Sequence, residues 1–184
     1  MSDSNITKKA IADALKRLLN EYSFEKISVG LVCKECGLNR KSFYYHFKDK
    51  YDLVNWIYYS EFIQHILTED IPDSWDLVLA ICEYFEENRT FYKKTFQAEG
   101  QNSFSDYFRS VVADILHDEL SDIYCSEESA DPYIEFYTDA FVCSIRKWIL
   151  KKDPEPAREF SAFLKKAIVG ISERVVELYG ADET

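Results

Sequence analysis

The sequence predicts an all-α protein with a small N-terminal unit and a larger helical body. Apolar residues recur at helical spacing along most of the chain, and no run alternates apolar and polar residues as a half-buried strand would. The chain has 184 residues, only five of them glycine, and its 47% hydrophobic content can fill a core in one or two small domains. We expect the units to be residues 1–50 and 51–184.

Three short helices are expected in the N-terminal unit. Residues 7–22 and 28–36 each carry apolar side chains on one helical face, and Ser28 stands where a helix N-cap belongs. Gly37 follows the second stretch, and a glycine just past a helix permits the left-handed conformation of a sharp turn. Asn39 can then cap a third helix. Two helices joined by such a turn form a helix-turn-helix.

The third helix has the residue pattern of a DNA-recognition helix. Phe43 and Phe47 lie four residues apart and share an inner face, which turns basic and polar side chains outward. Arginine and lysine donors match guanine O6 and N7, whereas tyrosine, histidine and serine suit phosphate oxygens. The positive end of the helix also attracts phosphate. The residues expected to contact DNA are Ser28, Asn39, Arg40, Lys41, Ser42, Tyr44, Tyr45, His46 and Lys50.

Short motifs in the first third of the chain match one known family in type and order. They are FEKISV at residues 24–29, CGL at 36–38, FYYHF at 43–47 and KDK at 48–50, followed by Leu53. Residues 7 to about 56 thereby resemble the N-terminal domain of the TetR family of bacterial transcription regulators. The resemblance implies two groups of DNA contacts: bases read by Arg40, Lys41, Ser42 and Tyr45, and backbone held by Ser28, Tyr44, His46 and Lys50. Lys41 departs from many members, which carry glycine or another small residue there.

A second resemblance concerns residues 46–57, HFKDKYDLVNWI. This segment is similar to the branch of the family that includes activators of dihydroxyacetone kinase operons. In that branch the regulator works with a kinase-like co-regulator protein. The resemblance therefore implies an alternative function, in which the C-terminal body of this chain docks such a partner.

The charge of the chain is divided between its two parts. Its formal net charge is −11, yet residues 1–56 hold ten Lys and Arg against seven Asp and Glu, which gives +3. The remaining residues hold twelve against 26, which gives −14. An acidic body would repel DNA and leave only the N-terminal face to dock, although an acidic surface also serves solubility.

The rest of the chain is expected to be helical. A fourth helix begins at Lys50, Pro72 precedes another helix, and Asn88 ends it. A short aromatic helix and a longer amphipathic helix come next. The expected order is a helix at 50–68, a helix at 72–88, a helix at 91–96, a polar loop at 99–102, a helix at 104–116 and a connection at 121–131.

Two long apolar stripes lie before and after Pro154 and Pro156. Such helices can pack inside their own domain or pair with a second copy in a four-helix interface. The TetR resemblance implies the second arrangement, a homodimer whose recognition helices, about 34 Å apart, enter successive major grooves. The residues expected at this interface are Phe141, Ile145, Trp148, Phe160, Leu164, Ile168, Ile171 and Val175.

Aromatic residues of the middle helices form the expected effector site. Aromatic side chains make up 16% of the chain, and rings with hydroxyl tips suit a small organic ligand. Ordinary core packing is the alternative reading of each ring. A ligand there could act through the fourth helix by favouring one spacing of the two DNA-binding units. The expected lining residues are Tyr59, Phe62, Trp75, Phe85, Phe108, Tyr137 and Phe141.

Neither an enzyme nor a resident cofactor is expected. The sequence has no nucleophile–base motif and no phosphate-cradling glycine loop, so we assign no catalytic residue. His65 and His117 have carboxylates nearby, but without a cluster of His and Cys we assign no metal site. The five cysteines are odd in number and indicate reduced thiols, and the isolated C-x-x-C of Cys33 and Cys36 is interpreted as structural.

The location expected for the protein is the cytoplasm. The N-terminus lacks the basic-then-apolar pattern of a targeting peptide, and no apolar run approaches the roughly 20 residues of a membrane span. Together with these residues, the TetR resemblance implies a bacterial, homodimeric DNA-binding regulator that recognises a palindromic operator in double-stranded DNA. Its activity would respond to a small organic effector or a protein co-regulator.

Overall fold

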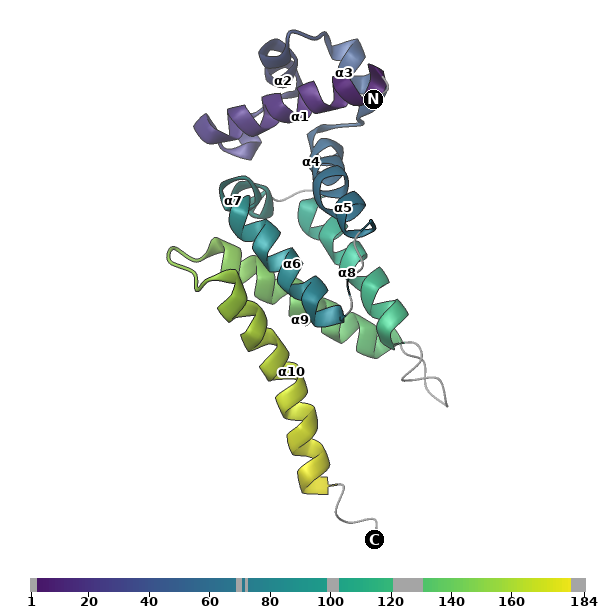
Figure 1. The fold of residues 1–184 in the computed structure, drawn as a ribbon. Helices are drawn as coiled ribbons and strands as arrows, with labels where there is room; N and C mark the ends of the chain where they lie inside the picture. Colours follow the sequence, from purple (N-terminus) through teal and green to yellow (C-terminus); the bar gives the residue numbers. More distant parts are fainter. Residues whose placement is uncertain (1–2, 69–70, 72, 99–102, 121–130, 180–184) are drawn as a thin grey trace.

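The computed structural model describes residues 3–68, 71, 73–98, 103–120 and 131–179, with backbone only at residues 3, 118–120 and 171–179 (Figure 1). Within these residues all regular structure is helical, so the predicted all-α fold is confirmed. Helices α1–α3 gather at one end, the other helices form the body, and α10 projects from the opposite end. The expected connections at 99–102 and 121–130 lie outside the described residues, whereas Asp131 begins a helix.

The N-terminal unit contains α1 (Asp3–Glu21), a short 3-10 turn η1 (Phe24–Lys26), α2 (Val29–Cys36) and α3 (Arg40–His46). The local features expected between these helices are confirmed. Ser28 Oγ accepts a hydrogen bond from Leu31 N at 3.2 Å and caps α2. Gly37 follows with φ of 70°, in the left-handed region that favours glycine. Asn39 Oδ1 then accepts from Ser42 N at 2.8 Å and caps α3.

A continuous apolar core joins the three helices. Leu15, Leu18 and Val32 of α1 and α2 are buried together with Phe43 and Phe47. The two phenylalanine rings lie 5.7 Å apart, centroid to centroid. Their burial fixes which side of α3 faces inward, and the polar side chains of α3 are therefore turned away from the core.

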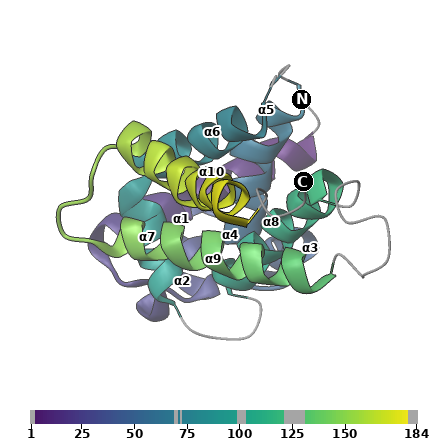
Figure 2. The same ribbon diagram turned by 90° about the horizontal axis from the view of Figure 1, so that it is seen from below.

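The body follows without a break in the chain. Its first helices are α4 (Lys50–Tyr58), a π-helical turn η2 (Tyr59–Ile63) and α5 (Gln64–Ile66), and then α6 (Ser74–Glu87) and α7 (Arg89–Gln97). The last three are α8 (Phe104–Leu120), α9 (Asp131–Leu150) and α10 (Ala157–Tyr179). Helix α8 packs on α9, and α10 packs along α6, as the view from below shows (Figure 2).

The π-helical turn was not visible in the sequence. We expected one regular helix from Lys50 to about Thr68, and the helical path is indeed continuous from Lys50 to Ile66. However, residues 59–63 form a wider turn that holds one residue more than an α-helical turn. The face presented by the following residues is rotated relative to a regular helix. Such turns are frequent at functional sites.

The turn between α9 and α10 is held by Trp148. Its ring stacks on Phe160 with centroids 4.7 Å apart and an interplanar angle of 4°. The indole N–H also donates to the carbonyl oxygen of Glu155 at 2.8 Å. Glu86 Oε1 of α6 accepts from the backbone N–H of Ala157 at 3.0 Å, which fixes the start of α10.

This packing changes the role of four residues expected at a dimer interface. Ile145, Trp148, Phe160 and Leu164 are each at most 5% exposed within a single chain, so they already belong to its own core. Phe141 and Ile168 are half-buried, and the side chains of Ile171 and Val175 are outside the described residues. The apolar stripes seen in the sequence are the inner faces of α9 and α10. An apolar stripe predicts that a helix face is buried, but it does not predict whether the same chain or a second copy covers that face.

Lys50 ties the two parts of the molecule together. Its Nζ donates to the carbonyl oxygens of Phe24 at 2.7 Å and Ile27 at 2.9 Å, and more weakly to that of Glu25 at 3.4 Å. The ammonium also lies 4.4 Å from the centroid of the Phe24 ring. Burial lowers the pKa of this ammonium, while Glu25 and Asp49 act in the opposite direction. The start of α4 is thereby fixed to the segment between α1 and α2.

Two further lysines connect α1 to the body. Lys94 of α7 donates from Nζ to the carbonyl oxygens of Leu19 and, at 3.1 Å, Tyr22, at the C-terminal end of α1. A cation there also complements the negative end of the helix dipole. On the other side, Lys16 Nζ pairs with Glu61 of the π-helical turn at 2.6 Å. Helix α1 is thus held to the body at both points.

Replacing Lys50 by methionine is expected to destabilise the fold. Lys50→Met keeps most of the apolar stem but removes the ammonium donor from the carbonyl oxygens of residues 24 and 27, of which the first keeps only the backbone N–H of Ile27. We expect the free energy of unfolding to fall by about 1–2 kcal/mol, measured by urea denaturation. Lys48→Met on the exposed neighbour is the control and should change it little. Equal losses in the two variants would contradict a clamp at Lys50.

Candidate nucleic-acid interface

The outward side of α3 is polar and exposed. Tyr45 is 83% exposed and Tyr44 is 57% exposed, although both are aromatic. Arg40 and Lys41 are exposed as well, and His46 is half-buried with its ring 4.9 Å from that of Tyr45. Exposed aromatic rings beside two cations at one end of the molecule form a surface suited to an anionic partner with flat apolar parts. DNA has both properties.

The capping residues belong to the same surface. Ser28 and Asn39 are exposed, and Ser42 Oγ donates to Asn39 Oδ1 at 3.2 Å. Ser28 uses its oxygen as the acceptor in the cap, so its O–H remains able to donate to a phosphate oxygen. The structure therefore brings eight of the nine residues expected to contact DNA onto neighbouring parts of α2 and α3: Ser28, Asn39, Arg40, Lys41, Ser42, Tyr44, Tyr45 and His46.

Lys50 is the exception among these residues. Its ammonium lies on carbonyl oxygens of residues 24–27, and an ammonium has three N–H donors. These contacts give it a structural role, and a phosphate contact for this residue stays a prediction. The sequence could not reveal this arrangement, because the acceptors are backbone atoms more than twenty residues away.

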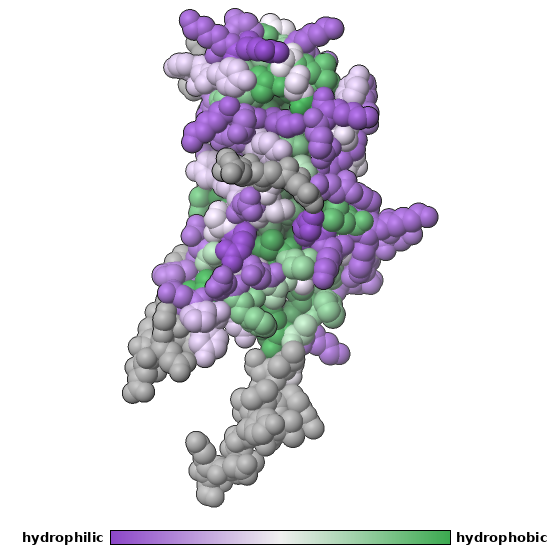
Figure 3. Space-filling view, turned by 180° about the vertical axis from the view of Figure 1, so that it is seen from behind, coloured by the Kyte–Doolittle hydropathy of each residue, from purple (hydrophilic) through white to green (hydrophobic). Residues whose placement is uncertain are grey.

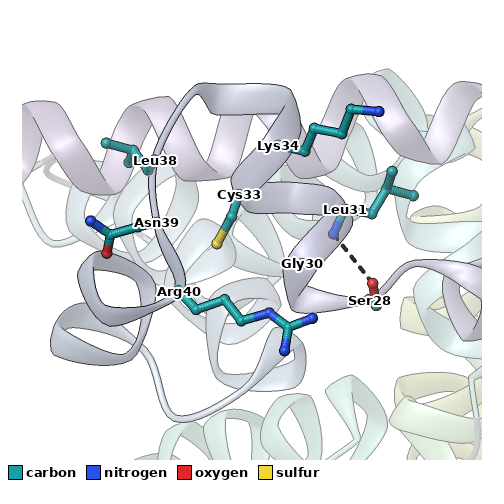
Figure 4. Close-up of a pocket in the computed structure, with 8 residues that line it drawn as sticks. All are labelled: Ser28, Gly30, Leu31, Cys33, Lys34, Leu38, Asn39 and Arg40. Carbon is teal, nitrogen blue, oxygen red and sulfur yellow. Dashed lines mark hydrogen bonds between the residues drawn. The ribbon is translucent and has the colours of Figure 1, made fainter.

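A shallow pocket opens between α2 and α3 on the same surface (Figure 4). Its volume is about 560 Å³. It carries two cationic side chains and no carboxylate, so its electrostatic character favours anions. The lining residues are Ser28, Gly30, Leu31, Cys33, Lys34, Leu38, Asn39 and Arg40. Burial raises the pKa of the Cys33 thiol, and Cys36 acts in the same direction, which keeps Cys33 protonated as a packed side chain.

The expected effector residues do not form one group. Phe62, Phe85 and Phe108 are buried around Tyr58, with ring centroids 5.3, 5.6 and 5.9 Å from that ring. This cluster is a packed aromatic core. Within the described part of the chain the Tyr58 hydroxyl has no hydrogen-bond partner, and burial raises its pKa well above the ordinary value.

The other expected effector residues lie in separate places. Trp75 of α6 and Phe141 of α9 face each other, with centroids 6.4 Å apart. Tyr137 contacts Phe136 on α9 at 5.4 Å, and Tyr59 is 41% exposed in the π-helical turn. Among the described residues, a second pocket of about 340 Å³ lies between α8 and α9. None of the expected effector residues lines it.

Polar contacts near the π-helical turn were missed by sequence reasoning. Tyr84 donates to Glu61 Oε2 at 3.5 Å, and its hydroxyl lies 2.9 Å from that of Tyr92. Burial raises the pKa of both tyrosines, so both remain neutral. Together with Lys16 these residues connect α1 to the aromatic core of the body. Their sequence separations carry no signal that could have predicted the contacts.

Among the described residues, no group of three or more His, Cys, Asp or Glu side chains is arranged to hold a metal ion. Within the same part of the chain, no helix is both long and apolar enough to cross a membrane.

The fold resembles that of solved regulators. The dihydroxyacetone kinase operon activator DhaS superposes with a TM-score of 0.65 at 21% identity, covering 91% of this chain and 97% of that chain. A TetR transcriptional regulator from Streptococcus agalactiae 2603V gives 0.68 at 20% identity, covering 90% and 94%. In sequence, the HTH-type dhaKLM operon transcriptional activator DhaS of Lactococcus lactis subsp. lactis (strain IL1403) is 27% identical over 144 residues, 78% of this chain and 74% of the relative.

Two family models match the chain. The model for bacterial regulatory proteins of the tetR family matches residues 11–57, which include α2, α3 and the start of the body. The model for a transcriptional regulator C-terminal region matches residues 73–170, more than half of the chain. The helix-turn-helix, whose exposed face is basic and aromatic, and the C-terminal body thus each match a model of the same kind of regulator. The chain belongs to the TetR family of bacterial transcription regulators.

Proposed function

We propose that the protein acts as a homodimer that binds a palindromic operator through α3 of each copy. In this proposal residues 1–50 are the DNA-binding domain and residues 51–184 the sensing and dimerisation domain, and the protein acts in the cytoplasm. The observation that supports this proposal is the orientation of α3 about its own axis, which buries Phe43 and Phe47 and leaves Tyr44 and Tyr45 exposed. The proposed DNA contacts are Ser28, Asn39, Arg40, Lys41, Ser42, Tyr44, Tyr45, His46 and Lys50.

The dimer interface is proposed on the outer faces of α9 and α10. Phe136 of α9 is 67% exposed and Phe163 of α10 is 60% exposed, and exposed apolar residues that gather into a patch mark interaction sites. Ala140 and Cys143 lie on the same side of α9 as Phe136 by helical spacing and are also exposed. Hydrophobic residues also gather near the end from which α10 projects (Figure 3). Ile168, Ile171 and Val175 complete the proposed interface, whereas Phe141, which faces Trp75 of α6, is left to the effector site.

Effector control is proposed to act through α4 and the π-helical turn. The turn carries Glu61, which holds α1 through Lys16, and α4 begins at the Lys50 clamp. A ligand that favours one position of this segment would shift the spacing of the two DNA-binding domains by the difference in its affinity for the two states. Trp75 and Phe141, which are half-buried, are the proposed contacts for a small organic effector.

A protein co-regulator is the second candidate for the signal. A sequence relative and a solved structure are both named as the operon activator DhaS, and the exposed aromatic side chains of α9 could also receive a protein. In this alternative the body docks a kinase-like partner. Phe136→Glu distinguishes the two: a variant that stays dimeric and binds DNA, but no longer regulates transcription in cells, would favour the co-regulator.

Selection of bound DNA from a random-sequence duplex library tests the proposed function. We expect the purified protein to enrich a palindrome, with half-sites about one helical turn apart. Binding should also weaken steeply with salt, because each neutralised phosphate contributes about −0.9 to the slope of log affinity against log salt. Enrichment of no sequence by the full-length protein would count against operator recognition.

Tyr45→Ala is expected to separate DNA binding from stability. The Tyr45 ring is 83% exposed, so its loss should leave the melting temperature nearly unchanged. Affinity for the selected duplex should fall about tenfold or more, measured by fluorescence anisotropy, since one lost base contact is worth about 1–3 kcal/mol. Tyr22→Ala, on an exposed tyrosine outside α3, is the control and should keep its affinity.

Phe163→Glu is expected to give monomers. A carboxylate without a partner would be buried at the proposed interface, which costs several kcal/mol. Light scattering should report the monomer mass, and affinity for the palindrome should drop because only one half-site is held. Ile6→Glu, on an exposed apolar residue of α1, should remain dimeric. A dimeric Phe163→Glu variant would place the interface elsewhere.

A further inference from the structure

Arg40 begins α3, but its guanidinium lies against the first turn of α2. A Cβ built on Gly30 would stand 2.7 Å from Arg40 Nη2, 3.3 Å from Nε and 3.4 Å from Cζ. Real Cβ atoms do not approach other heavy atoms as closely as the first of these distances. Only glycine at residue 30 therefore leaves room for Arg40 in this position. Figure 4 shows the side chain extending from α3 toward Ser28 and Gly30.

The surroundings of the guanidinium favour an anion. The pocket that it enters is lined by a second cation, Lys34, and by the exposed Ser28, with no carboxylate among the lining residues. Among the described residues, Arg40 has no ion-pair or hydrogen-bond partner in the protein. Its two-pronged donor set is thus available, and a phosphate group presents the two oxygens that match it.

The Arg40 side chain also points in a different direction from the residues that are proposed to read bases. A residue that reads base edges has to project from the outer face of the recognition helix into the major groove. Tyr45 does so with most of its ring exposed. Arg40 instead points sideways along the protein surface toward the capping residue of α2. With α3 docked in a major groove as proposed, that direction leads to the DNA backbone at the edge of the groove.

We propose that Gly30 is a positioning residue for DNA binding. Because Gly30 has no Cβ, the Arg40 side chain can lie against α2, and in that position its guanidinium holds a DNA phosphate. Base reading is left to Lys41, Ser42 and Tyr45. This inference rests on the proposed function and changes the role expected for Arg40 from the sequence. It also gives Gly30 a function in recognition that its type alone would not suggest.

A double-mutant cycle tests this proposal. Arg40→Ala, Gly30→Ala and the double variant are compared with the wild type on the selected palindrome and on a random-sequence duplex, across a range of salt concentrations. Arg40→Ala should lower affinity for both duplexes by a similar factor, about tenfold. It should reduce the salt slope by about 0.9, and the sequence preference obtained by selection should stay the same.

Gly30→Ala should fold and act through Arg40. The atoms in the way of its Cβ are the end of a flexible side chain, which can move aside. Alanine also has the higher helix propensity, so the melting temperature should rise. Affinity and salt slope should nevertheless change in the direction of Arg40→Ala. In the Arg40→Ala background the same substitution should have no further effect on binding.

Three outcomes would overturn the inference. Loss of preference at one base pair in Arg40→Ala would show that Arg40 reads a base. A binding defect of Gly30→Ala that persists without Arg40 would show that residue 30 acts independently of it. A Gly30→Ala variant with wild-type affinity and salt slope would show that Arg40 does not need a glycine at residue 30 to bind DNA. A wild type that binds neither duplex would instead overturn the proposed function itself.

Discussion

Phe43 and Phe47 determine how α3 is oriented about its own axis, and that orientation decides which side chains of α3 are exposed. Both rings are buried in the core shared by α1, α2 and α3. Burying an aromatic side chain of this size stabilises the fold by about 1.5–3 kcal/mol, so a rotated α3 would lose several kcal/mol. The neighbouring Tyr44 and Tyr45 must then point outward, because successive helical residues differ by about 100° in direction.

Lysine contacts add to the apolar core that runs from the DNA-binding unit into the body. Lys50 and Lys94 donate to backbone carbonyl oxygens, and Lys16 pairs with Glu61. Partly exposed hydrogen bonds and ion pairs of this kind are each worth about 1 kcal/mol. A few such contacts can be exchanged when the body changes shape, whereas a packed core would have to be disrupted.

Local features of the fold could be predicted from the sequence, and distant contacts could not. The caps by Ser28 and Asn39 and the left-handed Gly37 follow from residue type and position within one turn. The contacts of Lys50 with carbonyl oxygens and of Gly30 with Arg40 form only when the tertiary fold brings together residues that are distant in the sequence. The apolar stripes of α9 and α10 were visible, but the sequence could not tell that Trp148 and Phe160 fill one chain's own core.

The π-helical turn at residues 59–63 has a consequence for how this family member can diverge. It holds one residue more than a regular turn, and the helix continues on both sides of it. Deleting a single codon in this segment would leave an ordinary α-helix rather than a broken one. Since the segment carries Glu61 under α1, such a deletion would reset the register between the body and the DNA-binding unit. One small genetic step could thus shift the DNA-binding unit relative to the body without breaking the helix that joins them.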